Sequence, residues 1–163
     1  MSIIDAFRLD GKVAVVTGAN TGLGQGMSVA LAQAGAKVVG VARRSCEDTK
    51  KLIEGDGGEF AEVIADLSDM SAIDVIVNGA LAAFGKVDIL VNNAGISIIG
   101  LFQDMTRDEW DRIMNVNVGS VYNCCHFAIP DMINAKSGRI INISSVWGKS
   151  FSERMEIRTI FLS

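Results

Sequence analysis

A glycine-rich turn directly after a run of apolar residues constrains the fold of this chain more than any other feature. Residues 12–16 (KVAVV) form the run, and residues 17–24 (TGANTGLG) form the turn. A continuous apolar run bounded in this way predicts a strand buried on both faces of a parallel sheet. Gly18, Gly22 and Gly24 would let backbone N–H groups approach a phosphate at the N-terminus of the next helix. The alternative is a turn that binds no ligand, because the spacing G-x-x-x-G-x-G is not the standard dinucleotide pattern.

The same alternation of apolar strand and helix continues along the chain. Gly35 and Gly85 follow two predicted helices, as is typical of helix C-termini. Thr106 and Glu109 match a capping box that opens a long helix, and we expect Pro130 to open or kink a later turn. Five strands alternating with helices predict an α/β fold, a Rossmann-like doubly wound parallel sheet. The predicted strands are residues 12–16, 37–41, 60–65, 88–91 and 139–143, and the predicted helices are 23–34, 47–54, 70–84 and 106 to about 121 or beyond.

The composition favours one globular domain and excludes several other classes of protein. The chain has 163 residues, 49% of them apolar and 21% charged, with a net charge of −4. This acidic balance disfavours nucleic-acid binding, and no stretch approaches the roughly 20 apolar residues of a membrane span. The first residues lack the apolar segment of a secretory signal. Cys46, Cys124 and Cys125 form neither a disulfide framework nor a metal-ligand pattern, so we expect no metal and a cytoplasmic location.

The segments that follow the predicted strands hold the candidate binding residues, because ligands of such sheets bind beyond the carboxyl ends of the strands. Arg43 and Arg44 follow the second strand, where a cofactor with a free ribose 2′-hydroxyl usually meets an acidic residue. The absence of that acid and the presence of two arginines favour NADP over NAD. The alternative is two solvated surface arginines without a ligand.

Short polar segments follow the third and fourth predicted strands. Asp66, followed by Leu67, could accept a hydrogen bond from an adenine amino group or could cap the next helix. Residues 92–95 (NNAG) follow the fourth strand. Asparagine side chains there can join neighbouring strand ends by hydrogen bonds, and the small Ala94 and Gly95 leave space for a flat ring or a ribose.

Together these segments resemble the short-chain dehydrogenase/reductase family. Within that family, the first 40 residues are most similar to the 2-deoxy-gluconate (sugar-acid) dehydrogenases. Residues 139–148 are more similar to 3-oxoacyl-carrier-protein reductases. The likeness covers roughly residues 9–148, and its matching positions are Thr17, Gly18, Gly22, Gly24, Asp66, residues 92–95, Asn117 and residues 143–148 (ISSVWG).

The resemblance implies an enzyme that transfers a hydride between a nicotinamide cofactor and a secondary alcohol or ketone. It implies that Asp66 and Leu67 flank the adenine, and that Ser145 holds the substrate oxygen. Asn117 would position the water and backbone of a proton relay. The other implied cofactor-binding residues are Gly18, Asn20, Thr21, Gly22, Leu23 and Gly24 around the pyrophosphate and Asn93, Ala94 and Gly95 beside the ribose.

The chain departs from the family pattern after Gly148. The family's general acid/base is a tyrosine, followed four residues later by a lysine, but Arg158 and Leu162 stand at these positions. A positioned proton-transfer group contributes about 10²–10⁴-fold to rate, so we expect little or no turnover by this chain. The only tyrosine, Tyr122, precedes Ser145 and is expected in the core or on a subunit surface.

The departure leaves several alternatives open. We expect a dinucleotide-binding domain at 1–148 and a tail at 149–163 unlike the family, in a C-terminally truncated or altered form. The chain would be an impaired oxidoreductase, a catalytically inactive dinucleotide-binding module or a nonfunctional gene fragment. An exposed edge strand would favour a homo-oligomer or poor solubility. A sugar acid or a 3-oxoacyl compound is the expected substrate type; apolar residues 98–102 favour a less polar substrate, unless they only pack a loop.

Overall fold

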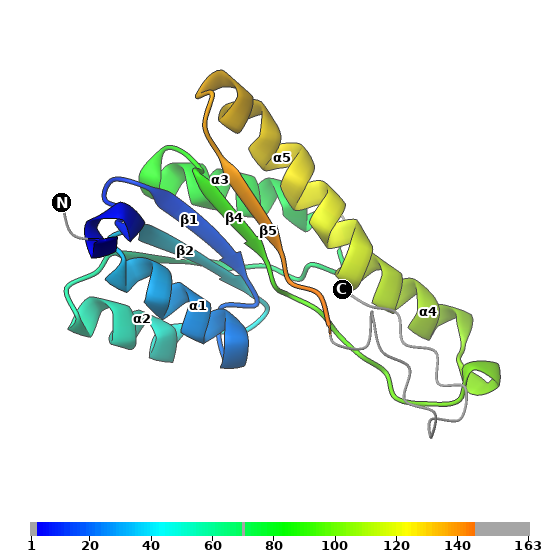
Figure 1. Cartoon of the computed structure of the whole chain (residues 1–163). Helices are drawn as coiled ribbons and strands as arrows, with labels where there is room; N and C mark the ends of the chain where they lie inside the picture. The colour runs from blue at the N-terminus through cyan, green and yellow to red at the C-terminus, as the bar shows by residue number, and fades with distance from the viewer. Residues whose placement is uncertain (1–2, 70, 146–163) are drawn as a thin grey trace.

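Five parallel strands form one sheet in the computed structural model, which describes residues 3–69 and 71–145 (Figure 1). Their order across the sheet is β3-β2-β1-β4-β5. The second and third strands therefore lie on one side of β1, and the fourth and fifth strands lie on the other side. This arrangement confirms the predicted Rossmann-like fold. The strands are β1 (Val13–Thr17), β2 (Lys37–Ala42), β3 (Phe60–Ile64), β4 (Ile89–Asn92) and β5 (Arg139–Asn142).

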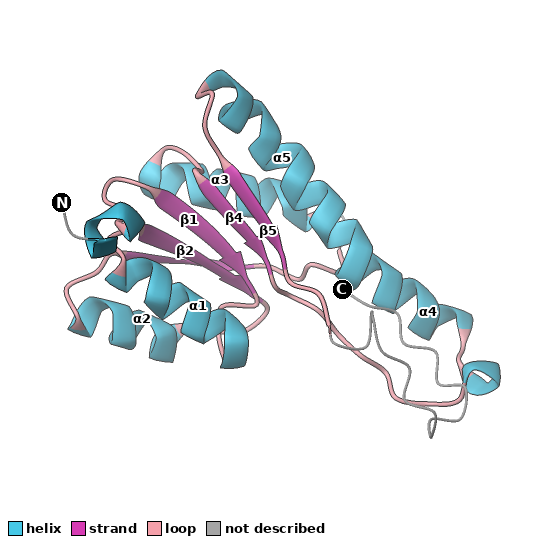
Figure 2. Ribbon diagram, in the orientation of Figure 1, coloured by secondary structure: helices cyan, strands magenta, loops and turns pink. Residues whose placement is uncertain are grey.

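Helices cover the sheet from both sides (Figure 2). On one face, α1 (Gly22–Gln33) packs over β1 and β2, and α2 (Glu47–Gly55) packs over β3. On the other, α3 (Ala72–Phe84) packs over β2 and β3, and α5 (Ser120–Asn134) over β4 and β5. The helix α4 (Arg107–Met114) leads into α5 through the π-helical turn η3 (Asn115–Gly119), and two 3₁₀ turns are η1 (Ile3–Phe7) and η2 (Phe102–Asp104).

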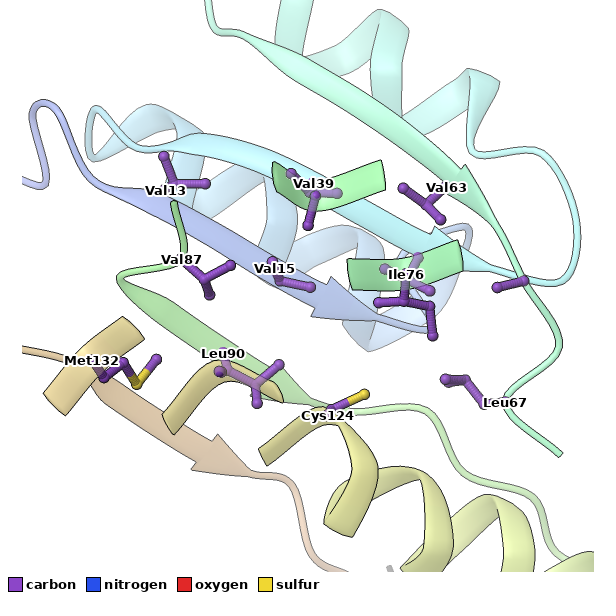
Figure 3. Packing of buried hydrophobic residues seen from close by; sticks show 14 residues of the cluster. Val13, Val15, Val39, Val63, Leu67, Ile76, Val87, Leu90, Cys124 and Met132 are labelled. Carbon is purple, nitrogen blue, oxygen red and sulfur yellow. The ribbon is translucent and has the colours of Figure 1, made fainter. Parts of the chain in front are cut away.

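The core lies in two layers because successive strand residues point to opposite faces of the sheet. Figure 3 shows the layer under α3 and α5, where Val15, Val39 and Leu90 meet Ile76 and Cys124. The opposite layer joins alternate residues of the same strands to α1 and α2. All five residues of β1 are buried, which explains why its sequence is apolar without alternation.

Several element boundaries differ from the predicted ones. β1 begins and ends one residue later than predicted, while β3 and β5 end one residue earlier. The helix predicted at 70–84 begins at Ala72, and Met70 lies outside the described residues. The predicted capping box of α4 is confirmed, since Thr106 and Glu109 exchange both hydrogen bonds.

The long helix predicted from Thr106 consists of three segments rather than one. The π-helical turn at Asn115–Gly119 separates α4 from α5, and such turns are frequent at functional sites. Pro130 lies inside α5, which continues to Asn134. The prediction that Pro130 opens a new turn is therefore wrong, while the alternative, a kink at Pro130, stays a prediction. A proline removes one backbone donor without ending a helix where tertiary packing holds it, and Ala128 and Met132 on either side are buried.

The strand β5 is the exposed edge that the sequence predicts. It pairs with β4 alone among the described strands, and all four of its residues are exposed. Among residues 3–69 and 71–145, no helix is long and apolar enough to cross a membrane.

Candidate functional site

A cavity of about 340 Å³ opens at the carboxyl ends of the strands. It brings together ten of the predicted site residues from four separate segments of the chain. Those residues are Gly18, Asn20, Thr21, Arg43, Arg44, Asp66, Leu67, Asn93, Ala94 and Gly95. The cavity therefore lies where the fold predicts a ligand.

The glycine-rich turn is built by backbone packing that side chains would prevent. Gly18 has a φ of +70° and Gly22 a φ of +58°, a region that favours glycine. A Cβ atom on Gly24 would lie 2.1 Å from the carbonyl oxygen of Gly18. Gly24 therefore lets α1 start directly behind the turn, while Gly18 lines the cavity itself.

Thr17 joins this turn to the segment after β4. Its Oγ1 accepts hydrogen bonds from the backbone N–H groups of Asn93 and Ala94, both at 3.0 Å. The Asn93 side chain donates back to the Thr17 carbonyl at 3.0 Å. These hydrogen bonds hold two walls of the cavity together: the glycine-rich turn after β1 and the segment after β4.

Asn92 performs the corresponding task one strand further along. Its Nδ2 donates to Oδ1 of Asn142 on β5 at 2.8 Å, and Asn92 itself is buried. This confirms the prediction that asparagine side chains in residues 92–95 join neighbouring strand ends.

Asp66 lies at the cavity wall as a pre-formed acceptor. Its Oδ1 accepts from the backbone N–H of Ser68 at 2.9 Å and from the Ser68 hydroxyl at 2.8 Å. The backbone hydrogen bond is the main cause that lowers the pKa of Asp66, and the positive charges of Arg43 and Arg112 act in the same direction. The alternative that Asp66 caps α3 is wrong, because the N-cap residue of that helix is Ser71.

Asn117 supports the cavity from behind. It is buried in the π-helical turn, where Oδ1 accepts from the backbone N–H of Ile96 at 2.8 Å and Nδ2 donates to the Ile96 carbonyl at 2.9 Å. Ile96 lines the cavity next to Gly95. The side chain of Asn117 therefore fixes the course of the segment after β4.

The remaining predicted residues lie outside the cavity lining. Leu23 is 74% exposed, and Gly22 lies in the exposed part of the turn. Ser145, half-buried, follows β5 by three residues. The tail at 149–163, including Arg158 and Leu162, lies outside the described residues.

Tyr122 is not a core residue. It is 66% exposed on α5, and its ring stacks on His126 with centroids 5.9 Å apart. The alternative of a surface position is therefore the correct one.

Sequence reasoning missed part of the cavity lining. Ala42 and Ala65 line it at the ends of two predicted strands, where their position was predictable. Ile96 and Val116 also line it. Val116 belongs to the π-helical turn, and no sequence signal indicated that this turn would point a residue toward the cavity.

Cys46 and Cys124 offer no reactive thiolate. Burial raises the pKa of Cys46 to about 11, with the charge of Glu62 acting in the same direction, and burial likewise raises the pKa of Cys124 to about 12. A thiol needs a lowered pKa to act as a nucleophile near neutral pH. Within the part of the chain that the structure describes, no three His, Cys, Asp or Glu side chains gather in a metal-ligand group.

Known proteins resemble this chain over most of its length. The model of the short chain dehydrogenase family matches residues 12–156. The chain is 43% identical over 145 residues to 2-dehydro-3-deoxy-D-gluconate 5-dehydrogenase from Dickeya dadantii, covering 88% of this chain and 57% of that protein. It is 35% identical over 143 residues to a 3-oxoacyl-(acyl-carrier-protein) reductase from Thermotoga maritima, covering 86% and 58%.

A solved structure extends the comparison to three dimensions. A metagenomic short-chain oxidoreductase in complex with NADP superposes with a TM-score of 0.84 at 41% identity, covering 88% of this chain and 66% of that one. The chain spans a little over half the length of the curated relatives that it matches. The matched family model, the relatives and the glycine-rich site agree, and the chain belongs to the short-chain dehydrogenase family.

Proposed function

We propose that the cavity is the NADP site of an oxidoreductase that interconverts a secondary alcohol and a ketone. The observation that carries this proposal is the convergence of a glycine-rich turn with Arg43 and Arg44 at one cavity. Backbone N–H groups of such a turn bind a pyrophosphate, and arginines bind a phosphate monoester. The nicotinamide ring, when bound, supplies or accepts the hydride.

Each predicted residue has a role in this proposal. Gly18, Asn20, Thr21 and Gly22 hold the pyrophosphate, with Leu23 beside them and Gly24 allowing the helix to start close behind. Asp66 accepts from the adenine amino group next to Leu67. Asn93, Ala94 and Gly95 border the ribose. The turn packs closely against the segment after β4, since a Cβ at Gly18 would approach Asn93 Nδ2 to 2.9 Å, and the bare Gly18 backbone therefore lines the cavity next to Asn93.

The arginines support NADP over NAD. Both side chains are exposed at the cavity, and within the described segment after β2 the first acidic residue is Glu47, already in α2. The metagenomic relative was solved in complex with NADP. A 2′-phosphate beside two guanidinium groups would gain charge-assisted hydrogen bonds that a 2′-hydroxyl cannot make.

We assign Ser145 and Asn117 to the part of the site where the reaction takes place. Ser145 would hold the substrate oxygen, since a positioned donor stabilises a developing oxyanion. Asn117 would keep the Ile96 backbone in place for a proton relay. The names of the relatives support a sugar acid or a 3-oxoacyl compound as the substrate type. We further propose that the dinucleotide-binding unit spans residues 1–148, that residues 149–163 are separate from it, and that the protein is a cytoplasmic homo-oligomer.

A second candidate is a dinucleotide-binding module without turnover. It is favoured by Arg158 and Leu162, which stand where the family has its tyrosine and lysine. Oxidation of NADPH by the purified chain, followed at 340 nm with a panel of 3-oxoacyl and sugar-acid ketones, separates the two. Turnover supports the oxidoreductase; saturable NADPH binding without turnover supports the module. Failure to bind NADPH would contradict both.

A further inference from the structure

The loop that carries the two arginines is anchored by a carboxylate from the neighbouring strand. Glu62 lies on β3, where its Cα is in register with Gly40 of β2. Its Oε2 accepts a hydrogen bond from the Ser45 hydroxyl at 3.1 Å and another from the backbone N–H of Cys46. Ser45 follows Arg44 directly, so both contacts hold the chain immediately after the arginines.

The anchor continues into the first turn of α2. The backbone N–H of Glu47 donates to Ser45 Oγ at 3.2 Å, so the Ser45 hydroxyl accepts from the helix and donates to Glu62. On the other side, Thr49 Oγ1 donates to the Ala19 carbonyl at 2.8 Å. The loop between β2 and α2 is therefore held to β3 by Glu62, and the helix α2 that follows it is held to the glycine-rich turn by Thr49.

We propose that Glu62 is a positioning residue for NADP selectivity: it holds residues 43–46 in the conformation that presents Arg43 and Arg44 to the cofactor's 2′-phosphate. This inference rests on the proposed NADP site. Arg43 and Arg44 are exposed side chains on a short loop, and a pre-ordered backbone lowers the entropy that phosphate binding must overcome. Glu62 does not itself line the cavity, so we expect it to act through the arginine loop rather than by contact with the cofactor.

The negative charge of Glu62 acts in the opposite sense, because it disfavours a nearby phosphate. Interactions between exposed charges are weakened by solvent and salt, and this carboxylate already accepts two hydrogen bonds from the loop. The anchoring effect therefore exceeds the repulsion. The two effects change NADPH affinity in opposite directions. Removal of the Glu62 side chain should weaken NADPH binding if anchoring dominates and strengthen it if repulsion dominates.

The test compares NADPH and NADH dissociation constants of the full chain and of Glu62→Ala, Glu62→Gln and Glu59→Gln. Glu62→Ala should weaken NADPH binding about fivefold to tenfold, as expected for loss of two hydrogen bonds to a charged acceptor, and change NADH binding less than about twofold. Glu62→Gln keeps an acceptor oxygen and should lie between. Glu59 directly precedes β3 and pairs with Lys37 instead of the arginine loop, so Glu59→Gln should match the wild type.

A measurement without cofactor tests the anchor separately. Hydrogen exchange of the Cys46 amide should accelerate at least about tenfold in Glu62→Ala and stay unchanged in Glu59→Gln. Tighter NADPH binding by Glu62→Ala, equal weakening of both cofactors, or unchanged exchange at Cys46 would overturn the inference. If the wild-type chain bound neither cofactor, the proposed function itself would fail, whereas selective wild-type binding with unaltered variants would reject the role of Glu62 alone.

Discussion

The strands β1 and β5 both pair in parallel with β4, yet they differ completely in burial. All five residues of β1 are buried and all four of β5 are exposed. β1 has a strand on each side and helices on each face, whereas β5 has one strand partner among the described elements. The difference shows that the site rests on the well-packed half of the sheet, and that the β5 side, which carries Asn142 and leads to Ser145, is held mainly through β4.

The largest expected effect on stability comes from truncating a side chain of β4, compared with truncating its register partner on β5. Leu90 of β4 is 1% exposed, and its register partner Ile140 of β5 is 36% exposed. Leu90→Ala should lower the free energy of unfolding by about 2–5 kcal/mol, because it leaves a cavity in the core. Ile140→Ala should lower it by about 1 kcal/mol or less. Urea unfolding of both variants measures the contrast; equal losses would show that the two strands are packed alike.

The next effect concerns the contact that joins the two halves of the site. Thr17→Val keeps the shape of the side chain but removes the acceptor for two backbone N–H groups. The unfolding free energy should fall by about 2 kcal/mol, within the range for buried donors left unpaired. Thr17→Ser retains the hydroxyl and serves as the matched control. A Thr17→Val protein as stable as Thr17→Ser would mean that water replaces the hydroxyl without cost.

Two glycines of α1 provide a sharper test of the turn. A Cβ on Gly24 would meet the Gly18 carbonyl, whereas a Cβ on Gly26 would meet nothing within 4 Å. Gly24→Ala should cost about 1–3 kcal/mol of stability and weaken NADPH binding at least about tenfold. Gly26→Ala should stabilise the helix by roughly 0.5 kcal/mol and leave binding unchanged. Thermal melts and NADPH titrations of the pair decide; similar behaviour of both variants would contradict the described turn.

A smaller effect is expected from the arginines, because they lie at the rim of the cavity. Replacing Arg43 and Arg44 together by alanine should weaken NADPH binding about tenfold, equivalent to about 1.4 kcal/mol, while NADH binding changes less than about twofold. Stability should not change, since both side chains are exposed. Equal weakening of both cofactors in parallel titrations would remove the evidence for 2′-phosphate recognition.

The smallest expected effect concerns Asp88, which joins the amino ends of β1 and β5 through hydrogen bonds. The side-chain carboxylate of Asp88 accepts a hydrogen bond from the backbone N–H of Val13 at 2.9 Å. The backbone carbonyl of Asp88 accepts another from the backbone N–H of Arg139 at 3.0 Å. Partial burial opposes the charged form, but hydrogen bonds from Lys86, Val13 and Lys12 outweigh it and lower the pKa of Asp88.

A lowered pKa has a defined sign in the stability profile. The contribution of Asp88 is present above the unfolded-state pKa of about 3.9 and is lost as the pH falls through the lower folded-state pKa. Asp88→Asn should therefore be less stable than the wild type by about 1 kcal/mol at pH 7, with the gap closing below about pH 4. Urea unfolding at several pH values measures the gap. A gap that stays constant from pH 7 to the most acidic point of the series would assign the loss to packing rather than to the charge.

The fold was predictable from sequence because the apolar runs and glycine stops are strong local signals. Residues 17–24 and 92–95 identified two cavity walls, and Arg43 and Arg44 a third. The π-helical turn around Asn117 was not predicted, since five residues are too few to show a change of hydrophobic period. The role of Glu62 was also beyond sequence reasoning, because it depends on the register between β2 and β3.

The most direct measurement is a fluorescence titration of the purified chain with NADPH and, separately, with NADH, following energy transfer from Trp110 and Trp147. We expect saturable binding of NADPH that is at least about tenfold tighter than that of NADH. Equal affinities would keep the dinucleotide site and reject 2′-phosphate recognition by Arg43 and Arg44. Absence of saturable binding by either cofactor would contradict the assignment of the cavity as a dinucleotide site.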